Sequence, residues 1–135
     1  SAWHETPGTP PLAARYFNLR VLPPRADLYA ACDARFLAML EDGALAEVRA
    51  LLAMGISLDS GAGKALGVAD LAAHLRGEVN LTKAATLAQT ATRQYAKRQT
   101  TWFKNQFIVN FEVNEKLSES IFQEIFANIR QFLLT

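Results

Sequence analysis

The sequence has few of the features that would place a protein in an unusual class. Its 135 residues include one cysteine, Cys32, which excludes an internal disulfide and favours a reducing compartment such as the cytoplasm. No run of about 18 apolar residues occurs, so no membrane span is expected. The amino terminus lacks a basic segment followed by an apolar one, and therefore does not resemble a signal peptide.

The chain also lacks a strong net charge. Fourteen basic and 13 acidic residues give a formal charge of +1, so any signal for nucleic-acid binding must be local. Half of the residues are hydrophobic, and the length predicts one domain with a buried core. Residues 1–12 contain three prolines and are predicted to be a linker or severed connection, which leaves residues 13–135 for the domain. Because no methionine begins the chain, we expect a piece of a longer protein.

Motifs for metal or nucleotide binding are incomplete. His4 and His74 are far apart, and neither has a ligand neighbour at helical spacing, which argues against a zinc site. The segment at residues 61–65 (GAGKA) would need glycine at the position of Leu58 and serine or threonine at that of Ala65 to form a phosphate loop. A flexible loop is the expected structure there.

Hydrophobic periodicity predicts a mostly helical chain. Apolar residues recur at helical spacing in five segments, and the stripe of the first includes Cys32, which is expected to be a buried thiol. Asn80 is the expected N-cap of the longest helix. The predicted helices cover residues 25–41, 45–54, 68–75, 81–103 and 118 onward.

Two segments, residues 16–22 and 106–113, alternate apolar with polar residues and are predicted to be β-strands. Two strands do not form a stable sheet unaided. They either pair with each other under the helices or lie at the edges of a larger sheet. No obvious acid–base pair occurs among the late carboxylates, Glu112 included, and a solvated face is the expectation for each.

The most distinctive stretch is residues 92–102 (TRQYAKRQTTW), within the longest segment that lacks an acidic residue. On a helix its cations would lie on one face, and a second, apolar face would dock on the core. The face with the cations would hold Arg93, Lys97, Thr101 and Lys104, and the apolar face Ala84, Ala88, Ala91, Tyr95 and Trp102.

Cations on a helix most often form a solvated face, but three details favour an anion partner here. No acidic residue is interleaved to form pairs one turn apart. Threonine and glutamine, which contact phosphates and bases, lie among the cations. Arg98 lies near the side of Tyr95 and Trp102, where a partly desolvated cation would attract an anion. Arg35 lies at the border of an apolar stripe. It is expected either to snorkel to solvent or form an ion pair, or instead to bind a phosphate in bidentate fashion.

Three segments resemble, in order and spacing, motifs of the tRNA dimethylallyltransferases, or isopentenyltransferases. Residues 92–103 (TRQYAKRQTTWF) resemble the signature TR-x-YAKRQ-x-TWF. Residues 25–48 resemble the family's R-x-x-LY…RF-x-x-ML-x-x-G-x-x-x-EV helices, and residues 64–78 its KA-(I/L)-GY…YL-x-GE segment. The chain departs from these patterns at residues 31–32 and at Val68.

The resemblance implies an α/β fold with a phosphate-loop core, of which this chain would be the mostly α-helical carboxyl-terminal portion, with about five helices and two strands. The family transfers a dimethylallyl group from dimethylallyl diphosphate to N6 of adenosine 37, in the anticodon stem-loop of tRNAs that read codons beginning with U. It uses Mg²⁺, whose ligands are expected mainly outside this chain, as are the phosphate loop and the catalytic base. The chain alone is therefore expected to be inactive.

By the same resemblance, four cations are expected near the diphosphate and six side chains near tRNA. The diphosphate-binding candidates are Arg35, Arg93, Lys97 and Arg98. The tRNA-binding candidates are Lys97, Arg98, Gln99, Thr101, Trp102 and Lys104. Two other hypotheses stay open: a non-catalytic RNA-binding module, and a protein-interaction domain whose cations are merely solvated. Unpaired strand edges would favour self-association of such a piece.

Overall fold

The computed structural model describes residues 13–59 and 61–134. The predicted linker at residues 1–12 and His4 lie outside this part of the chain. Within it, five α-helices, one 3₁₀ helix and two strands follow one another. They are β1 (Leu19–Val21), α1 (Arg25–Glu41), α2 (Ala44–Ala53), η2 (Gly61–Lys64), α3 (Val68–Leu75), α4 (Leu81–Gln106), β2 (Phe111–Val113) and α5 (Glu119–Leu134).

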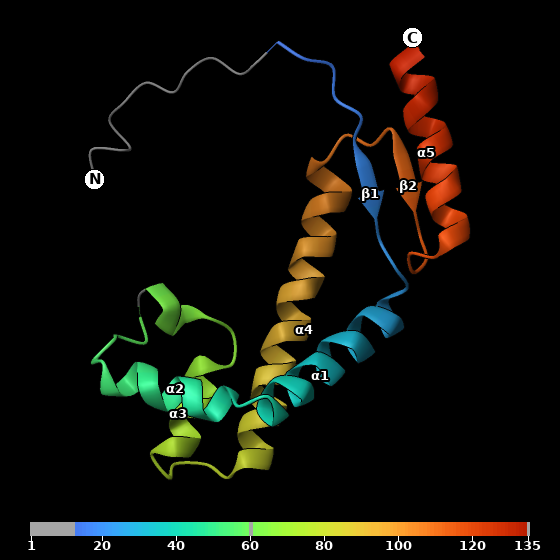
Figure 1. The fold of residues 1–135 in the computed structure, drawn as a ribbon. Coiled ribbons are helices and arrows are strands. Elements are labelled where there is room, and N and C mark those ends of the chain that lie inside the picture. Colours follow the sequence, from blue (N-terminus) through green and yellow to red (C-terminus); the bar gives the residue numbers. More distant parts are fainter. Residues whose placement is uncertain (1–12, 60, 135) are drawn as a thin grey trace.

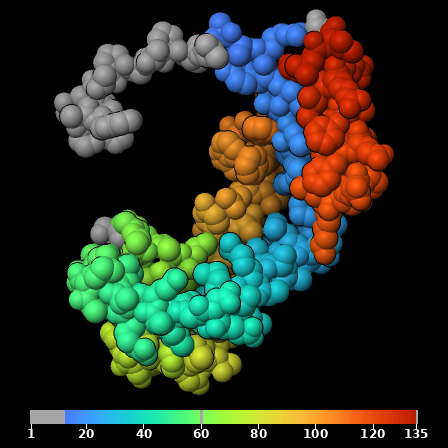
Figure 2. Space-filling model, in the orientation of Figure 1, coloured from blue at the N-terminus to red at the C-terminus, as the bar shows by residue number. Residues whose placement is uncertain are grey.

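The long helix α4 connects two separate clusters of elements (Figure 1). Its amino-terminal half packs with α1 and α3, α2 packs in turn on α3 and α1, and the strands and α5 lie near its other end. The space-filling view shows the helical cluster and the sheet at opposite ends of an open, curved molecule (Figure 2). Each end therefore has its own small core, and α1 and α4 hold the two together.

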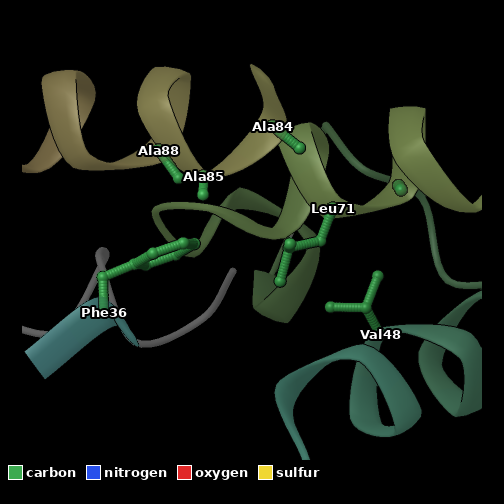
Figure 3. Packing of buried hydrophobic residues seen from close by; sticks show 7 residues of the cluster. Phe36, Val48, Leu71, Ala84, Ala85 and Ala88 are labelled. Atoms are coloured by element: carbon green, nitrogen blue, oxygen red, sulfur yellow. The ribbon is translucent and has the colours of Figure 1, made fainter. Parts of the chain in front are cut away.

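The core of the helical cluster is built around small residues on α4 (Figure 3). Ala84 and Ala88 are fully buried, and Phe36 of α1 and Leu71 of α3 pack beside them. Alanine has no side chain beyond its Cβ atom, so the neighbouring helices can approach α4 closely. Val48 extends this core to α2.

Gly67 makes that close packing possible. It precedes α3 with φ of +91°, a left-handed conformation that favours glycine, and a Cβ atom there would lie 2.8 Å from the ring of Phe36. The residue is therefore required both for its backbone conformation and for its lack of a side chain. A similar constraint applies to Gly63 in η2, whose Cβ would meet the carbonyl oxygen of Ser57 at 2.2 Å.

The two strands pair with each other, in parallel, and Leu19, Arg20 and Val21 lie opposite Phe111, Glu112 and Val113. A parallel pair needs a crossover connection, and here all of the helices from α1 to α4 form it. One face of the pair packs on α5, where Val113, Ile121 and Ile125 are buried. The two described strands therefore pair with each other in one two-stranded sheet.

Most of the predicted elements are confirmed, and their bounds differ in informative ways. The bounds of α1 and α3 match the prediction, and the Asn80 side chain caps α4 by accepting a hydrogen bond from the Lys83 amide at 2.8 Å. The predicted loop at residues 56–64 contains η2. The strand predictions were too long, because β1 and β2 have three residues each.

The predicted apolar face of α4 was wrong in its second half. Tyr95 is 44% exposed and Trp102 is 54% exposed, whereas the buried row continues through Thr92 and Ala96. The close approach of α1 excludes large rings from that row. In α1, Phe36 is the one buried residue. Cys32 is half-buried, and is therefore not the core thiol that the sequence predicted.

The described residues lack two features: a helix that could span a bilayer and a cluster of metal ligands. None of the helices in residues 13–59 and 61–134 is long and apolar enough to span a bilayer. The same residues contain no group of three or more histidine, cysteine or acidic side chains that could hold a metal ion. His74 instead places Nδ1 3.0 Å from the carbonyl oxygen of Val79.

Candidate anion-binding and RNA-binding site

The last three turns of α4 carry a cluster of cations and exposed polar side chains. Lys97, Arg98, Thr101 and Trp102 line one wide, shallow cavity that is open to solvent, together with Gln94, Asn105 and Gln106, and all of these residues belong to α4. Helical periodicity brings these residues to one side of α4, and the short side chains of the opposite side face α1. Among the described residues that line this cavity, none is acidic.

Arg98 lies beside an aromatic ring, as the sequence predicted. Its Cζ atom is 5.7 Å from the centroid of the Tyr95 ring. Such a cation–π contact orients the guanidinium and leaves its N–H groups able to bind an anion. Trp102 packs edge-on against Phe103, with 5.1 Å between ring centroids, and still exposes more than half of its surface.

Arg93 is placed differently from the other cations of the stretch. Its Nη1 atom donates to both carboxylate oxygens of Asp33, at 2.6 and 2.7 Å, and its Nη2 atom donates to Thr90 Oγ1 at 3.0 Å. Gln89 adds a hydrogen bond to the Asp33 carbonyl oxygen at 3.1 Å. These contacts join α4 to α1, and a carboxylate from another helix already neutralises the Arg93 charge.

Arg35 lines a second cavity, of about 590 Å³, between α1, α4 and the segment formed by the end of η2 and the two residues after it. The cavity also contains Lys64, which no sequence pattern indicated as a site residue. The two cations come from separate elements, and Cys32, Met39 and Tyr95 supply apolar and aromatic wall. None of its described lining residues is acidic, so the cavity offers positive charge next to apolar surface.

The sequence contains one local signal for Lys64 as an anion-binding residue, although it could not show that Lys64 lies beside Arg35. Lys64 follows Gly63 in a segment that fails only as a complete phosphate loop. The lysine is exposed, and the tight packing of Gly63 on Ser57 fixes the turn that carries it. A lysine on a constrained turn can bind a phosphate without the remainder of that motif.

The two remaining tRNA-binding candidates, Gln99 and Lys104, lie beside the first cavity, whereas Thr101 belongs to it. Gln99 is exposed and lines a small hollow of about 150 Å³ near the end of β1. The Thr101 hydroxyl donates to the carbonyl oxygen of Lys97 at 3.0 Å, within the helix. Lys104 lines a separate groove, which Lys97 and Thr101 also border. The structure thus brings Lys97, Arg98, Thr101 and Trp102 together and keeps Arg35 and Arg93 apart from them.

Comparison with known proteins gives this arrangement a context. The model of the IPP transferase family matches residues 1–106. The chain belongs to the IPP transferase family. This confirms the resemblance found in the three sequence motifs, and the mixed α/β, mostly helical fold agrees with it.

Curated relatives of this IPP transferase chain carry the name tRNA dimethylallyltransferase. The protein from Paramagnetospirillum magneticum is 47% identical over 98% of this chain and 42% of its own length. That from Rhodospirillum centenum is 59% identical over 72% of this chain and 31% of its own length. The chain therefore spans less than half the length of these relatives.

Solved structures show the same fold. The full-length tRNA isopentenylpyrophosphate transferase of Bacillus halodurans aligns with a TM-score of 0.77 and 28% identity, over 89% of this chain and 40% of that protein. The tRNA delta(2)-isopentenylpyrophosphate transferase of Staphylococcus epidermidis aligns with a TM-score of 0.75 over the same shares. The arrangement of helices and strands described above is thus shared with solved members of the family.

Proposed function

We propose that this chain acts as part of a tRNA dimethylallyltransferase, an enzyme that moves a dimethylallyl group from its diphosphate to N6 of adenosine 37 in tRNAs that read codons beginning with U. The observation that carries the proposal is a pair of cation-bearing cavities without acidic lining residues, one at Arg35 and one at Lys97 and Arg98. Membership of the IPP transferase family supports it.

In this proposal the cavity at Arg35 faces the dimethylallyl diphosphate. The reaction breaks the bond between the allylic carbon and the diphosphate oxygen, and negative charge develops on the leaving group. Arg35 and Lys64 supply fixed positive charge for it, and the apolar wall at Met39 suits a hydrocarbon group. Because Asp33 already neutralises Arg93, we assign Arg93 a positioning role rather than direct contact with the diphosphate.

The end of α4 is proposed to contact the anticodon stem-loop. Lys97, Arg98 and Lys104 are exposed and would bind backbone phosphates, and Gln99 and Thr101 are polar partners beside them. The exposed Trp102 ring offers a surface on which an unstacked loop base can stack. An unstacked loop base can enter an active site because no duplex has to be opened first.

Mg²⁺ is a proposed cofactor of the complete reaction, but the described residues do not fit a site for it. Their cavities carry cations, and no cluster of suitable ligands is found among residues 13–59 and 61–134. We therefore propose that other groups hold the ion. Of this chain, 98% aligns with the Paramagnetospirillum magneticum protein, but the alignment covers only 42% of that protein's length. We therefore also propose that turnover requires further segments.

The RNA-binding part of the proposal is tested by titrating an anticodon stem-loop at several salt concentrations. Binding should weaken with salt, and Lys97→Gln with Arg98→Gln should make the slope of log K against log salt shallower by about 0.7–0.9 for each phosphate that these side chains neutralise. Lys83→Gln, an exposed lysine at the other end of α4, is the matched control and should keep the slope. Salt-independent binding would instead favour a protein-interaction domain.

The catalytic part needs a complementation experiment. The chain is combined with the remaining segments of the Paramagnetospirillum magneticum enzyme, and dimethylallyl transfer to tRNA is measured. Restored transfer that Arg35→Gln abolishes supports the proposal. Binding of tRNA with no transfer in a folded complex would favour the non-catalytic RNA-binding module.

A further inference from the structure

Arg20 connects the sheet to the last turn of α4, next to the side chains that are proposed to contact RNA. It is the middle residue of β1, and its Nη1 atom donates to the carbonyl oxygen of Phe103 at 2.9 Å. The same guanidinium pairs with Glu112, the residue opposite Arg20 on β2. One side chain therefore contacts both the neighbouring strand and α4.

The Phe103 carbonyl belongs to the end of a helix. α4 ends at Gln106, and the carbonyl oxygens of a helix's last turn accept no hydrogen bond from within the helix. A cation at this end also interacts favourably with the helix dipole. Arg20 supplies both the donor and the charge. Because its side chain is only 17% exposed, the contact is largely shielded from water.

Phe103 transmits this constraint to Trp102. The Phe103 ring packs edge-on against the Trp102 ring, with 5.1 Å between centroids, and also against Phe107, with 5.7 Å between centroids. Trp102 is 54% exposed, so its ring is held by these local contacts rather than by the core. The backbone position at Phe103 therefore affects how the Trp102 ring faces solvent.

We propose that Arg20 is a positioning residue for RNA binding, which holds the last turn of α4 and the Trp102 ring in the conformation on which a loop base of the RNA stacks. This rests on the proposed function, since it takes the end of α4 as the RNA-contacting surface. A side chain that is ordered before binding loses less conformational entropy when RNA binds. Arg20 is mostly buried and paired with Glu112, so it acts through Phe103 and not by contact with phosphate.

The substitution Arg20→Gln removes the guanidinium, and its effect is measured by titrating the anticodon stem-loop at several salt concentrations. Binding should weaken about two- to tenfold, the cost of ordering one freed side chain on binding. The slope of log K against log salt should equal that of the wild-type chain, because Arg20 neutralises no phosphate. A shallower slope would show direct contact between Arg20 and RNA and would overturn the positioning role.

Glu112→Gln is the matched control at the same junction. It removes the ion pair between the strands but leaves the Arg20 guanidinium able to donate to Phe103. It also removes a negative charge that interacts with Lys104, so it does not weaken the attraction for an anion. Stem-loop binding should therefore be at least as tight as in the wild-type chain. Equal weakening in Arg20→Gln and Glu112→Gln would show that Arg20 acts only through strand pairing, and would reject the proposal.

Heteronuclear ¹H–¹⁵N NOE values of the ¹⁵N-labelled chain test the positioning in the absence of RNA. Arg20→Gln should lower these values at Asn105 and Gln106 and shift the indole N–H signal of Trp102, which a Trp102→Phe variant assigns. Val48→Ala opens a cavity in the core of the helical cluster and controls for a general loss of stability. It should leave the end of α4 unchanged.

Two results separate this inference from the function on which it rests. Unchanged NOE values at the end of α4 in Arg20→Gln, or equal changes in Val48→Ala, would overturn the role of Arg20 even if the wild-type chain binds the stem-loop. A wild-type chain that does not bind the stem-loop would overturn the proposed function, and lowered NOE values in Arg20→Gln would then still support the ordering of α4 by Arg20.

Discussion

Arg93 lies one turn before Lys97 on α4 but makes contacts of a different kind. The side chains of Arg93 and Asp33 are 29% and 34% exposed, and one guanidinium nitrogen, Nη1, donates to both carboxylate oxygens. Paired guanidinium and carboxylate groups of this geometry are rigid as well as attractive. The pair fixes the rotation of α1 against α4, and Arg35 lies two residues from Asp33 on the same helix. Arg93 thus helps to hold α1, the helix that carries Arg35, against α4.

Replacing Arg93 should therefore destabilise the fold. Arg93→Gln leaves a half-buried carboxylate without its partner, at an expected cost of about 1–3 kcal/mol in the free energy of unfolding. Urea denaturation measures this, and the loss should be non-additive with that of Asp33→Asn. Arg98→Gln removes an exposed cation from the same helix and should change stability by less than about 0.5 kcal/mol. Equal stability of the two arginine variants would contradict the positioning role.

Some site residues could be predicted from sequence and others could not. Arg98 near Tyr95 and the Asn80 cap follow from spacing within one helix. Asp33 and Arg93 are 60 residues apart, and no local pattern indicates which acid faces which base. Lys64 was missed for the same reason, since it is only the fold that brings it beside Arg35.

At the scale of elements, one polar junction joins β1, β2 and the end of α4. Arg20 pairs with Glu112, the residue opposite it in the register, and donates to the carbonyl oxygen of Phe103 at 2.9 Å. Hydrogen bonds from Asn114 and Arg20 lower the pKa of Glu112 from its ordinary value of 4.5. The junction connects both strands to the end of α4. Glu112 keeps partial exposure, and its pairing with Arg20 could not be predicted from the sequence because the two residues are 92 positions apart.

A lowered carboxyl pKa predicts a specific dependence of stability on pH. The charged form of Glu112 is favoured by folding, so its contribution is present above about pH 4.5 and is lost as the pH falls through the lowered folded pKa. Glu112→Gln should lower the urea midpoint at pH 7, and the difference from wild type should shrink at pH 3. Glu124→Gln on the exposed side of α5 serves as control. An equal decrease of the urea midpoint at both pH values would indicate that the substitution acts through side-chain packing rather than through the charge of Glu112.

The helices were easier to predict than the strands for a physical reason. Periodicity and caps are local, and they set the bounds of α1 and α3 correctly. A strand ends where its partner ends, so the alternating patterns at residues 16–22 and 106–113 could not reveal that only three residues of each pair. The buried face of α4 was misjudged because large rings were expected inside, whereas close helix packing selects alanine.

At the scale of the whole molecule, apolar surface gathers at the end that carries the sheet. The sheet has two strands in the described part of the chain. On α5, Ile121 and Ile125 are buried against β2, but Phe126 is 56% exposed and Leu133 is 70% exposed. Exposed apolar patches next to strand edges favour association between proteins. We therefore propose that this chain self-associates through the sheet and α5.

Sedimentation velocity over a range of concentrations tests this surface. The wild-type chain should sediment faster as concentration rises, because association buries Phe126 and its neighbours. Phe126→Glu should shift the chain toward monomer, since it would place an unpaired charge in the interface. Met54→Glu is the matched control, because Met54 is 67% exposed but follows α2 in the other cluster. A monomer at every concentration would exclude self-association, and the same shift in both variants would exclude α5 as the contact surface.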